Sequence, residues 1–490
     1  MATDADGDSA ERADGDSAEW VTSIDEERHT ELDVEGEVPA WLDGSLVRNG
    51  PGTFDIGDQR VGHYFDGLAM LRKFGFRDGR VTYRNRFLRT DAYEDATNGE
   101  YSGGFGTDES LSVLERVVAF LRPASPTDNT NVNVWRFGGD HAALTETKYL
   151  TLFDPETLET TGLTTYRGEP EAQQVSGHPH HDRDRGETVS MSTYYGRQTE
   201  YRVWRQADDS WERETVCRIP VDKPAYLHSF ALTDRYVVLV EFPLVVSPLK
   251  LLIPSNEAFI KRFEWEPDRG TRFRVVDRQS GEVVAEPVTE AFFCFHHVNA
   301  YEDPGDGRGA ELVVDMVTFP DARSIDELYF EDGTAPSDVA TEGAQLSRCR
   351  VSLGGRTDAA VERRRLHEGH LGMPRVSPDV YASEYRYVYA HGEPGEKLVG
   401  FPESVLKVDV ETGEAVWRDL GGYVSEPVFV PHPDEDAEDA GVVLTVALGP
   451  DGDRSILYVF DAADLALLAE APLPHHLPMD FHGQFFPGVH

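Results

Sequence analysis

Residues 228–240, HSFALTDRYVVLV, carry the two features that decide how this chain folds. The segment ends in an apolar run rich in valine, which is typical of a β-strand. It begins with a histidine that is flanked by apolar and small residues. The segment therefore predicts a buried strand with a histidine at its entrance, and both features recur elsewhere in the chain.

Similar apolar runs follow one another from about residue 30 onward, separated by turn signals. Among them are residues 79–84, 201–204, 272–277, 311–315, 385–389 and 441–446. So many short strands predict an all-β fold, either a pair of sandwiches, a large barrel or a propeller. The 490 residues have room for seven blades at roughly 40–50 residues per blade, although no strict repeat of that length is visible. The best helical stretches are residues 108–121 and 254–263.

The composition is strongly acidic, with a formal net charge of −43, and only seven of the 46 basic residues are lysines. Such a surface suits concentrated salt, where screening weakens the repulsion between like charges, so we expect a halophilic source. The same charge argues against nucleic acid as a partner, because binding to phosphates needs a basic face. An acidic heptapeptide occurs at residues 5–11 and again at 13–19 without the spacing of a calcium loop, and we expect residues 1–28 to form a disordered tail.

The cysteine content and the N-terminus indicate where the protein resides. Three cysteines, Cys217, Cys294 and Cys349, are too few and odd in number for a disulfide framework. The N-terminus is acidic where a secretory signal would be basic and apolar, and no run of 18 apolar residues is present. We therefore expect a cytoplasmic protein.

Four histidines lie in blocks of apolar and turn residues: His178, His228, His296 and His482. Their separations of 50, 68 and 186 residues exclude a local metal finger, but the side chains can meet if distant strands converge on one axis. One alternative is a zinc pair within the cluster His178, His180 and His181. Cys294, two residues before His296, is either a further ligand or a small buried hydrophobe.

Two glutamates, Glu146 and Glu426, lie in equally apolar, strand-like settings. A carboxylate inside a core needs a partner, and the outward N–H of a metal-bound imidazole is a good one, because the hydrogen bond fixes the tautomer and the ring orientation. The alternative is that each glutamate lies on an edge strand in solvent.

At these residues the chain resembles the carotenoid cleavage oxygenase family, and its animal branch most. The blocks that carry the resemblance are residues 42–52, 63–67, 82–93, 143–147, 296–302 and 481–483, with residues 226–230 and 82–93 closest to the animal branch. The resemblance implies that residues 29–490 form a single catalytic domain. That domain would be a seven-bladed β-propeller with a loop-and-helix cap over one face.

The resemblance also implies an Fe(II) site on the propeller axis, held by the imidazoles of His178, His228, His296 and His482. Glu146 and Glu426 map to carboxylates that orient these imidazoles. A third such glutamate is missing, because Gly372 stands in its place. Glu368, His370 or a water molecule would have to take over its task.

The activity that the resemblance implies is oxidative cleavage of a C=C double bond of a carotenoid or apocarotenoid by O₂, with retinal among the candidate products. Phe65, Phe105, Thr145 and Phe481 would line the substrate cavity. Residues 242–254, and next residues 108–121, are candidates for an apolar patch that takes substrate from a membrane surface. Other activities on the same fold are cleavage of a stilbene-type alkene, retinoid isomerisation, and binding of carotenoid without catalysis.

Overall fold

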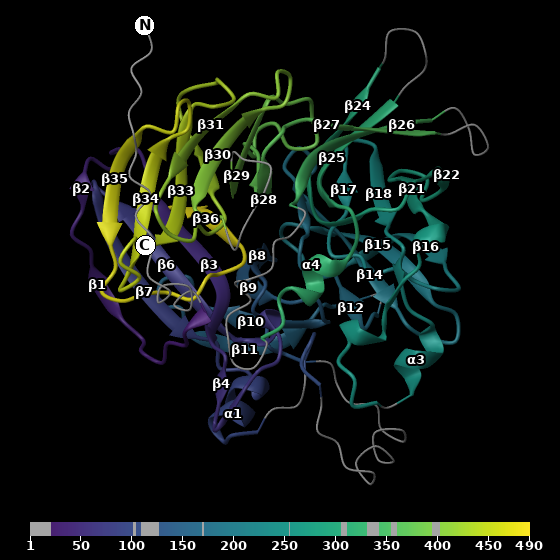
Figure 1. Cartoon of the computed structure of the whole chain (residues 1–490), viewed down its shortest axis with the longest axis horizontal. Coiled ribbons are helices and arrows are strands. Elements are labelled where there is room, and N and C mark those ends of the chain that lie inside the picture. The colour runs from purple at the N-terminus through teal and green to yellow at the C-terminus, as the bar shows by residue number, and fades with distance from the viewer. Residues whose placement is uncertain are drawn as a thin grey trace, which may run out of the picture.

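The structure, a computed structural model, describes residues 21–100, 104–108, 127–168, 171–253, 255–304, 311–330, 343–353, 360–393 and 402–490. Its strands form seven antiparallel sheets in sequence order around a common centre, and Figure 1 shows the N-terminal and C-terminal sheets side by side. The fold is a seven-bladed β-propeller, which confirms the predicted class.

Each blade contains four or five strands. The first blade holds β1 (His29–Glu31), β7 (Arg80–Phe87), β6 (Leu68–Arg77), β3 (Gly44–Thr53) and β36 (Gly483–Pro487). The second holds β8 (Asn133–Phe137), β9 (Asp140–Leu144), β10 (Tyr149–Phe153) and β11 (Thr160–Thr165). The third holds β12 (Gln174–Val175), β13 (His180–Asp182), β14 (Glu187–Tyr194), β15 (Glu200–Ala207) and β16 (Glu214–Pro220). The fourth holds β17 (Ala231–Leu232), β18 (Tyr236–Glu241), β21 (Thr271–Asp277), β22 (Val283–Ala285) and β23 (Val288–Thr289).

The remaining three blades follow in the same order along the chain. The fifth holds β24 (Phe293–Asp303), β25 (Glu311–Phe319), β26 (Gln345–Ser352) and β27 (Val361–Arg365). The sixth holds β28 (His370–Arg375), β29 (Tyr387–Glu393), β30 (Ser404–Asp409) and β31 (Ala415–Asp419). The seventh holds β32 (Val428–Pro431), β33 (Gly441–Leu448), β34 (Ser455–Asp461), β35 (Leu467–Pro472) and β2 (Glu35–Gly36). Two short ribbons lie outside the blades: β4 (Asp55–Ile56) with β5 (Gln59–Arg60), and β19 (Leu244–Val245) with β20 (Glu264–Trp265).

The ring is closed by strands from both ends of the chain. The C-terminal strand β36 pairs with β3 of the first blade, and the N-terminal strand β2 pairs with β35 of the seventh. Closure of this kind removes the free sheet edge that an open row of blades would expose. It also brings the last residues of the chain to the centre, next to residues far earlier in the sequence.

Packing between blades explains why many strands appear in the sequence as continuous apolar runs. The central strand β25 is buried along nearly all of its length, since neighbouring blades cover both of its faces. The outer strand β7 instead alternates buried and more exposed residues, because only one of its faces meets a neighbour. The apolar runs of the sequence thus correspond to the inner and central strands of the blades.

Helices are short and lie in loops. The described α-helices are α1 (Asp91–Thr97), α3 (Pro248–Leu252) and α4 (Arg323–Asp326), and the 3₁₀ helices are η2 (Tyr64–Asp66), η3 (Ile260–Arg262) and η4 (Pro267–Arg269). In Figure 1, α1 and α3 lie at the same end of the molecule, below the blades. None of the described helices has the length and apolar character needed to cross a membrane.

Three sequence predictions need correction or fall outside the described residues. The predicted helix over residues 254–263 is wrong, because only the short turn Ile260–Arg262 is helical among the described residues of that stretch. The predicted helix over residues 108–121 lies almost wholly outside the described residues. Residues 21–28 were expected in the disordered tail, but Val21 and Ile24 are buried in a core cluster with first-blade residues, so the packed chain begins by residue 21.

Candidate metal centre

The four predicted histidines come together at the centre of the propeller. His178 lies between β12 and β13, His228 shortly before β17, His296 within β24 and His482 immediately before β36. Each belongs to a different blade, and one ligand nitrogen from each lies within 4.8 Å of the others. The structure therefore brings together side chains that the sequence separates by up to 304 residues.

The imidazole nitrogens point toward a shared centre. The Nε2 atoms of His178 and His228 are 2.9 Å apart, and those of His228 and His296 are 3.3 Å apart. Two nitrogens that bind one ion at right angles, each at about 2.1 Å, lie about 3 Å from each other. Lone pairs on facing neutral nitrogens would otherwise repel, so the arrangement suits a cation between them. The donor set fits a divalent transition metal, and imidazole alone does not choose among iron, zinc, copper and nickel.

The surroundings favour the unprotonated forms of His178 and His296. Burial lowers the pKa of His178 well below its ordinary value, and the nearby His482, His228 and His296 lower it further. Burial followed by His482 and His228 has the same effect on the pKa of His296. A neutral imidazole has the free lone pair that a metal needs. The site is therefore ready to bind metal at neutral pH.

Glu146 holds the imidazole of His228. Its Oε1 lies 2.6 Å from His228 Nδ1, and its Oε2 accepts a hydrogen bond of 2.9 Å from the hydroxyl of Tyr226. With Nδ1–H committed to the carboxylate, Nε2 of His228 carries the lone pair that faces the centre. Glu146 follows β9 in the second blade, so it is not an edge-strand glutamate in solvent.

Glu426 holds His482 in the same way but within an ion pair. Its Oε1 lies 2.8 Å from His482 Nδ1, and its Oε2 accepts a hydrogen bond of 3.0 Å from the backbone N–H of Gly483. Arg375 donates to both oxygens, at 2.9 and 3.2 Å. Burial opposes ionisation, but the charges of Arg375 and His482 outweigh it and lower the pKa of Glu426 to about 2. This carboxylate is ionised throughout the neutral range.

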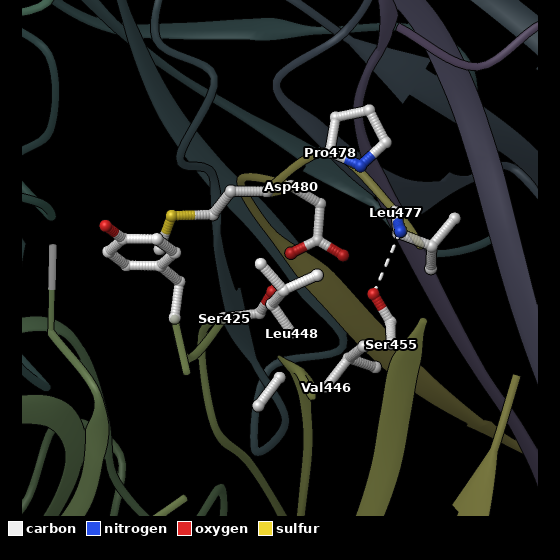
Figure 2. A pocket seen from close by; sticks show the side chains of 10 residues that line it. Ser425, Val446, Leu448, Ser455, Leu477, Pro478 and Asp480 are labelled. Atoms are coloured by element: carbon white, nitrogen blue, oxygen red, sulfur yellow. Dashed lines mark hydrogen bonds between the residues drawn. The ribbon is translucent and has the colours of Figure 1, made fainter. Parts of the chain in front are cut away.

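A second ion pair fixes the strand end that carries His482. Arg48 binds Asp480 through two hydrogen bonds of 2.5 and 2.6 Å, and it also donates to the backbone carbonyl of Glu426 at 2.7 Å. Figure 2 shows Asp480 beside a small hollow, together with Ser425 and Leu448. The hollow has room for about one water molecule, so it cannot take a long substrate. It lies behind the groups that support His482.

The alternative ligands are engaged elsewhere. His180 faces the carbonyl of Phe230 at 2.9 Å through Nε2, and His181 is exposed and pairs with Asp208. Cys294 is buried, its Sγ lies 3.2 Å from the carbonyl oxygen of His296, and burial raises the pKa of its thiol well above the ordinary value. The structure thus contradicts the local zinc pair and the cysteine ligand.

The third supporting glutamate has no counterpart among the residues first considered for it. The side chain of Glu368 is 83% exposed and pairs with Arg365 on the surface. His370 is buried but lies opposite Glu393, two residues along the strand pair from Gly372. An exposed side chain that pairs on the surface cannot support a buried imidazole at the centre, so Glu368 does not replace the missing glutamate.

Three of the four predicted cavity residues form one aromatic group beside the histidines. The ring of Phe65 lies 5.3 Å from that of Phe105 and 5.2 Å from that of Phe481. Phe295, which the sequence did not single out, lies 6.1 Å from Phe65 and 5.3 Å from the ring of His228. Thr145 is buried next to Glu146 in the chain.

Sequence reasoning missed Tyr226 and Arg375, and in both cases a local signal was present. Tyr226 lies two residues before His228, and alternate residues of an extended chain share a face. Arg375 follows Gly372 by three residues in the same block, next to a β-bulge between Gly372 and Arg375 that re-aims the side chains. A buried glutamate at 426 also required a positive partner, which the sequence alone did not identify.

Comparison with known proteins gives relatives along almost the whole chain. The family model described as retinal pigment epithelial membrane protein matches residues 21–487. A mitochondrial carotenoid-cleaving dioxygenase of Macaca fascicularis is 34% identical over 93% of this chain and 91% of its own length. A beta,beta-carotene 15,15'-dioxygenase of Homo sapiens is 30% identical over 92% of this chain and 91% of its own length.

Solved structures show the same architecture. A variant of the Synechocystis apocarotenoid oxygenase superposes with a TM-score of 0.84 at 27% identity, and covers 96% of this chain and 98% of its own. The cobalt-substituted form of that oxygenase superposes with a TM-score of 0.82 at 27% identity over the same shares. The second structure is thus of a protein with this fold in which cobalt has been substituted.

Proposed function

The chain belongs to the carotenoid cleavage oxygenase family, and from this premise we propose that it is a dioxygenase that cleaves a C=C double bond of a carotenoid or apocarotenoid with O₂. The observation that carries the proposal is the meeting of four imidazoles at the propeller centre, next to an aromatic group. We propose that His178, His228, His296 and His482 hold Fe(II), and that Glu146 and Glu426 orient His228 and His482.

The proposed reaction balances without a cosubstrate. One double bond of the polyene and one O₂ give two aldehydes, R–CH=CH–R′ + O₂ → R–CHO + R′–CHO, so each product carries one oxygen atom of O₂. When bound, Fe(II) supplies the redox-active centre at which O₂ reacts with the alkene. Retinal is one product that such a cleavage gives.

The side chains of this protein would bind and orient the substrate and would exclude water from the site. Phe65, Phe105 and Phe481 offer an apolar surface against which a conjugated chain can lie beside the histidines. Exclusion of water by these rings protects the reacting alkene from side reactions. The buried ion pair of Glu426 with Arg375 keeps a fixed negative charge behind His482.

Incubation of the iron-loaded protein with β-carotene, apocarotenals and stilbenes under ¹⁸O₂ tests the proposal. We expect two aldehydes from a carotenoid substrate, each with one ¹⁸O after rapid trapping by reduction. His228→Ala serves as the inactive control and His181→Ala, which alters an exposed histidine, as the active one.

Other outcomes would assign a different activity. Products from stilbenes alone would make the protein a stilbene-type cleavage enzyme, and a rearranged retinoid without ¹⁸O would make it an isomerase. Tight carotenoid binding with neither metal nor products would leave a carrier and contradict the proposal.

The proposed substrate dissolves in membranes, and we propose that the exposed apolar side chains within residues 242–253 contact the membrane surface. Within this stretch Phe242 and Val246 are buried, whereas Leu249 and Ile253 are 70% and 60% exposed. A chain of aromatic contacts leads inward from the residues that follow: Phe259 to Phe105 at 6.4 Å, and Phe105 to Phe65 at 5.3 Å. An exposed apolar tip that continues into an aromatic path is suited to the transfer of an apolar substrate.

Sedimentation with neutral lipid vesicles at high salt tests this contact. The double variant Leu249→Ser/Ile253→Ser is expected to lose most of its vesicle binding and to keep activity on substrate in detergent. Leu467→Ser, which alters a half-exposed leucine on β35, is the matched control. Equal vesicle binding by all three proteins would contradict the membrane contact.

A further inference from the structure

His296 is held differently from His228 and His482. Its Nε2 faces the centre, 3.3 Å from Nε2 of His228, so its Nδ1–H points away from the centre. In the described part of the chain no side chain is recorded as a hydrogen-bond partner of this Nδ1, whereas His228 and His482 each have a glutamate there. A ligand imidazole without such a partner has neither a fixed tautomer nor a fixed ring plane.

Position 372 needs a glycine because a larger side chain would not fit there, and not because of its backbone conformation. Gly372 is paired with His391 across strands β28 and β29, and its φ is not in the left-handed region. A Cβ atom at position 372 would lie 2.5 Å from Nε2 of His391. Real Cβ atoms do not approach other atoms so closely, so the tip of the His391 ring occupies the space that a side chain at position 372 would need.

His391 is positioned to accept a hydrogen bond through this same nitrogen. Its Nδ1 lies 2.8 Å from the carbonyl oxygen of Val424 and therefore carries the proton. Burial lowers the pKa of His391 to about 4, although Val424 and Glu426 oppose the shift, so the ring is neutral and its Nε2 has a free lone pair. The residue is 7% exposed, so its ring is held among packed neighbours.

His391 is also close to His296. Its charged form would lower the pKa of His296 through space, next after the effects of burial, His482 and His228. The strand β28 that carries Gly372 packs against β24, which carries His296. The missing side chain at position 372 therefore leaves space in which His391 of β29 can extend toward His296.

We infer that His391 is the positioning residue for His296: its Nε2 accepts the hydrogen bond of the outward N–H of His296 through one water molecule, in the place where the family pattern has a glutamate. A neutral nitrogen thus replaces a carboxylate on this side of the ring, and Gly372 is the change that admits it. The inference rests on the proposed metal centre.

Metal binding measured by calorimetry or chelator competition, with Co(II) and Fe(II) under anaerobic conditions, tests the inference. We expect His391→Ala to bind about 10–100-fold more weakly than the wild type and to shift the visible absorption bands of bound Co(II). His391→Gln, whose amide oxygen can reach the position of Nε2, should retain more affinity than His391→Asn, which can replace only Nδ1. His370→Ala, in the same strand pair, is the control and should bind as the wild type does.

A reciprocal exchange tests the spatial argument. Gly372→Glu alone should lower the melting temperature, because the new side chain meets the ring of His391. In the double variant Gly372→Glu/His391→Ala the ring is gone, and the carboxylate should restore metal affinity to the wild-type level or above it. This recovery would not occur if His391 served only to fill space.

The outcomes separate this inference from the proposed function. If the wild type binds no divalent metal, or His228→Ala binds as well as the wild type, the metal centre itself is wrong. If the wild type binds metal and His391→Ala binds equally well with the same Co(II) spectrum, only the role of His391 is overturned. Higher metal affinity in His391→Asn than in His391→Gln would show that His391 serves only as the hydrogen-bond partner of the Val424 carbonyl.

Discussion

His228 and His482 each have a carboxylate behind them, whereas among the described residues no carboxylate is hydrogen-bonded to His178 or His296. The carboxylates themselves differ: Glu146 has the neutral hydroxyl of Tyr226 as its second partner, but Glu426 is bound by the guanidinium of Arg375 and by a backbone N–H. One half of the ring, His228 and His482, is thus held by carboxylates, and the other half, His178 and His296, is not. The difference teaches that a symmetric set of ligands does not need symmetric support.

The largest effect should come from loss of a ligand on either half of the ring. His178→Ala and His228→Ala are both expected to lower Fe(II) affinity by more than about 100-fold, which exceeds the about 10–100-fold typical of supporting groups. Metal content after anaerobic loading and gel filtration measures this. A His178→Ala protein that retains full iron would show that only the half with carboxylates binds the metal.

Next in size is the cost of removing the ionised carboxylate. Glu426→Gln leaves Arg375 without its counter-charge, so we expect the free energy of unfolding of the metal-free protein to fall by about 3–5 kcal/mol. Glu146→Gln changes a carboxylate whose partners are the hydroxyl of Tyr226 and the imidazole of His228. It should lower the free energy of unfolding by about 1–3 kcal/mol. Urea unfolding at pH 7 compares the two variants, and equal losses would remove the distinction between the two carboxylates.

The same ion pair predicts a dependence of stability on pH. The pKa of Glu426 falls from 4.5 in the unfolded chain to about 2 in the folded one, so its contribution of about 3 kcal/mol is complete above pH 4.5 and is lost as the pH falls toward 2. Below pH 4.5 the unfolding free energies of wild type and Glu426→Gln should therefore converge. Two parallel curves from pH 7 to pH 2 would show that Glu426 is not responsible.

The smallest expected effect is that of the neutral partner. Tyr226→Phe removes the hydrogen bond to Glu146 Oε2 and should lower the unfolding free energy by about 1.5 kcal/mol. Since Glu146 still binds His228 at 2.6 Å, metal affinity should change by less than in Glu146→Gln. Calorimetric titration with Co(II) measures the difference. An equal loss of affinity in both variants would make Tyr226 as important as the carboxylate.

The sequence allowed a good prediction of which residues gather at the centre. The apolar runs predicted strands because residues such as those of β25 are buried on both faces, and the spacing of the histidines required a fold that converges on an axis. The blocks shared with a known family then indicated the propeller. The prediction of a helix at residues 254–263 was wrong because tertiary contacts decide the conformation of a loop segment. One such contact is the hydrogen bond from the backbone N–H of Ile260 to the backbone carbonyl of Phe105.

The amino-acid sequence by itself determined that this chain is β-rich and acidic, that four histidines occupy strand-like apolar blocks, and that position 372 holds a glycine. Local pattern suffices for these features because they depend on residue type and on neighbours along the chain. Only the tertiary structure decided which charge lies behind each imidazole. Arg375 reaches Glu426 from the next blade, and His391 fills the space beside Gly372 from the neighbouring strand. Such contacts join residues far apart in sequence, so they are set by how the blades pack and by what space remains between them.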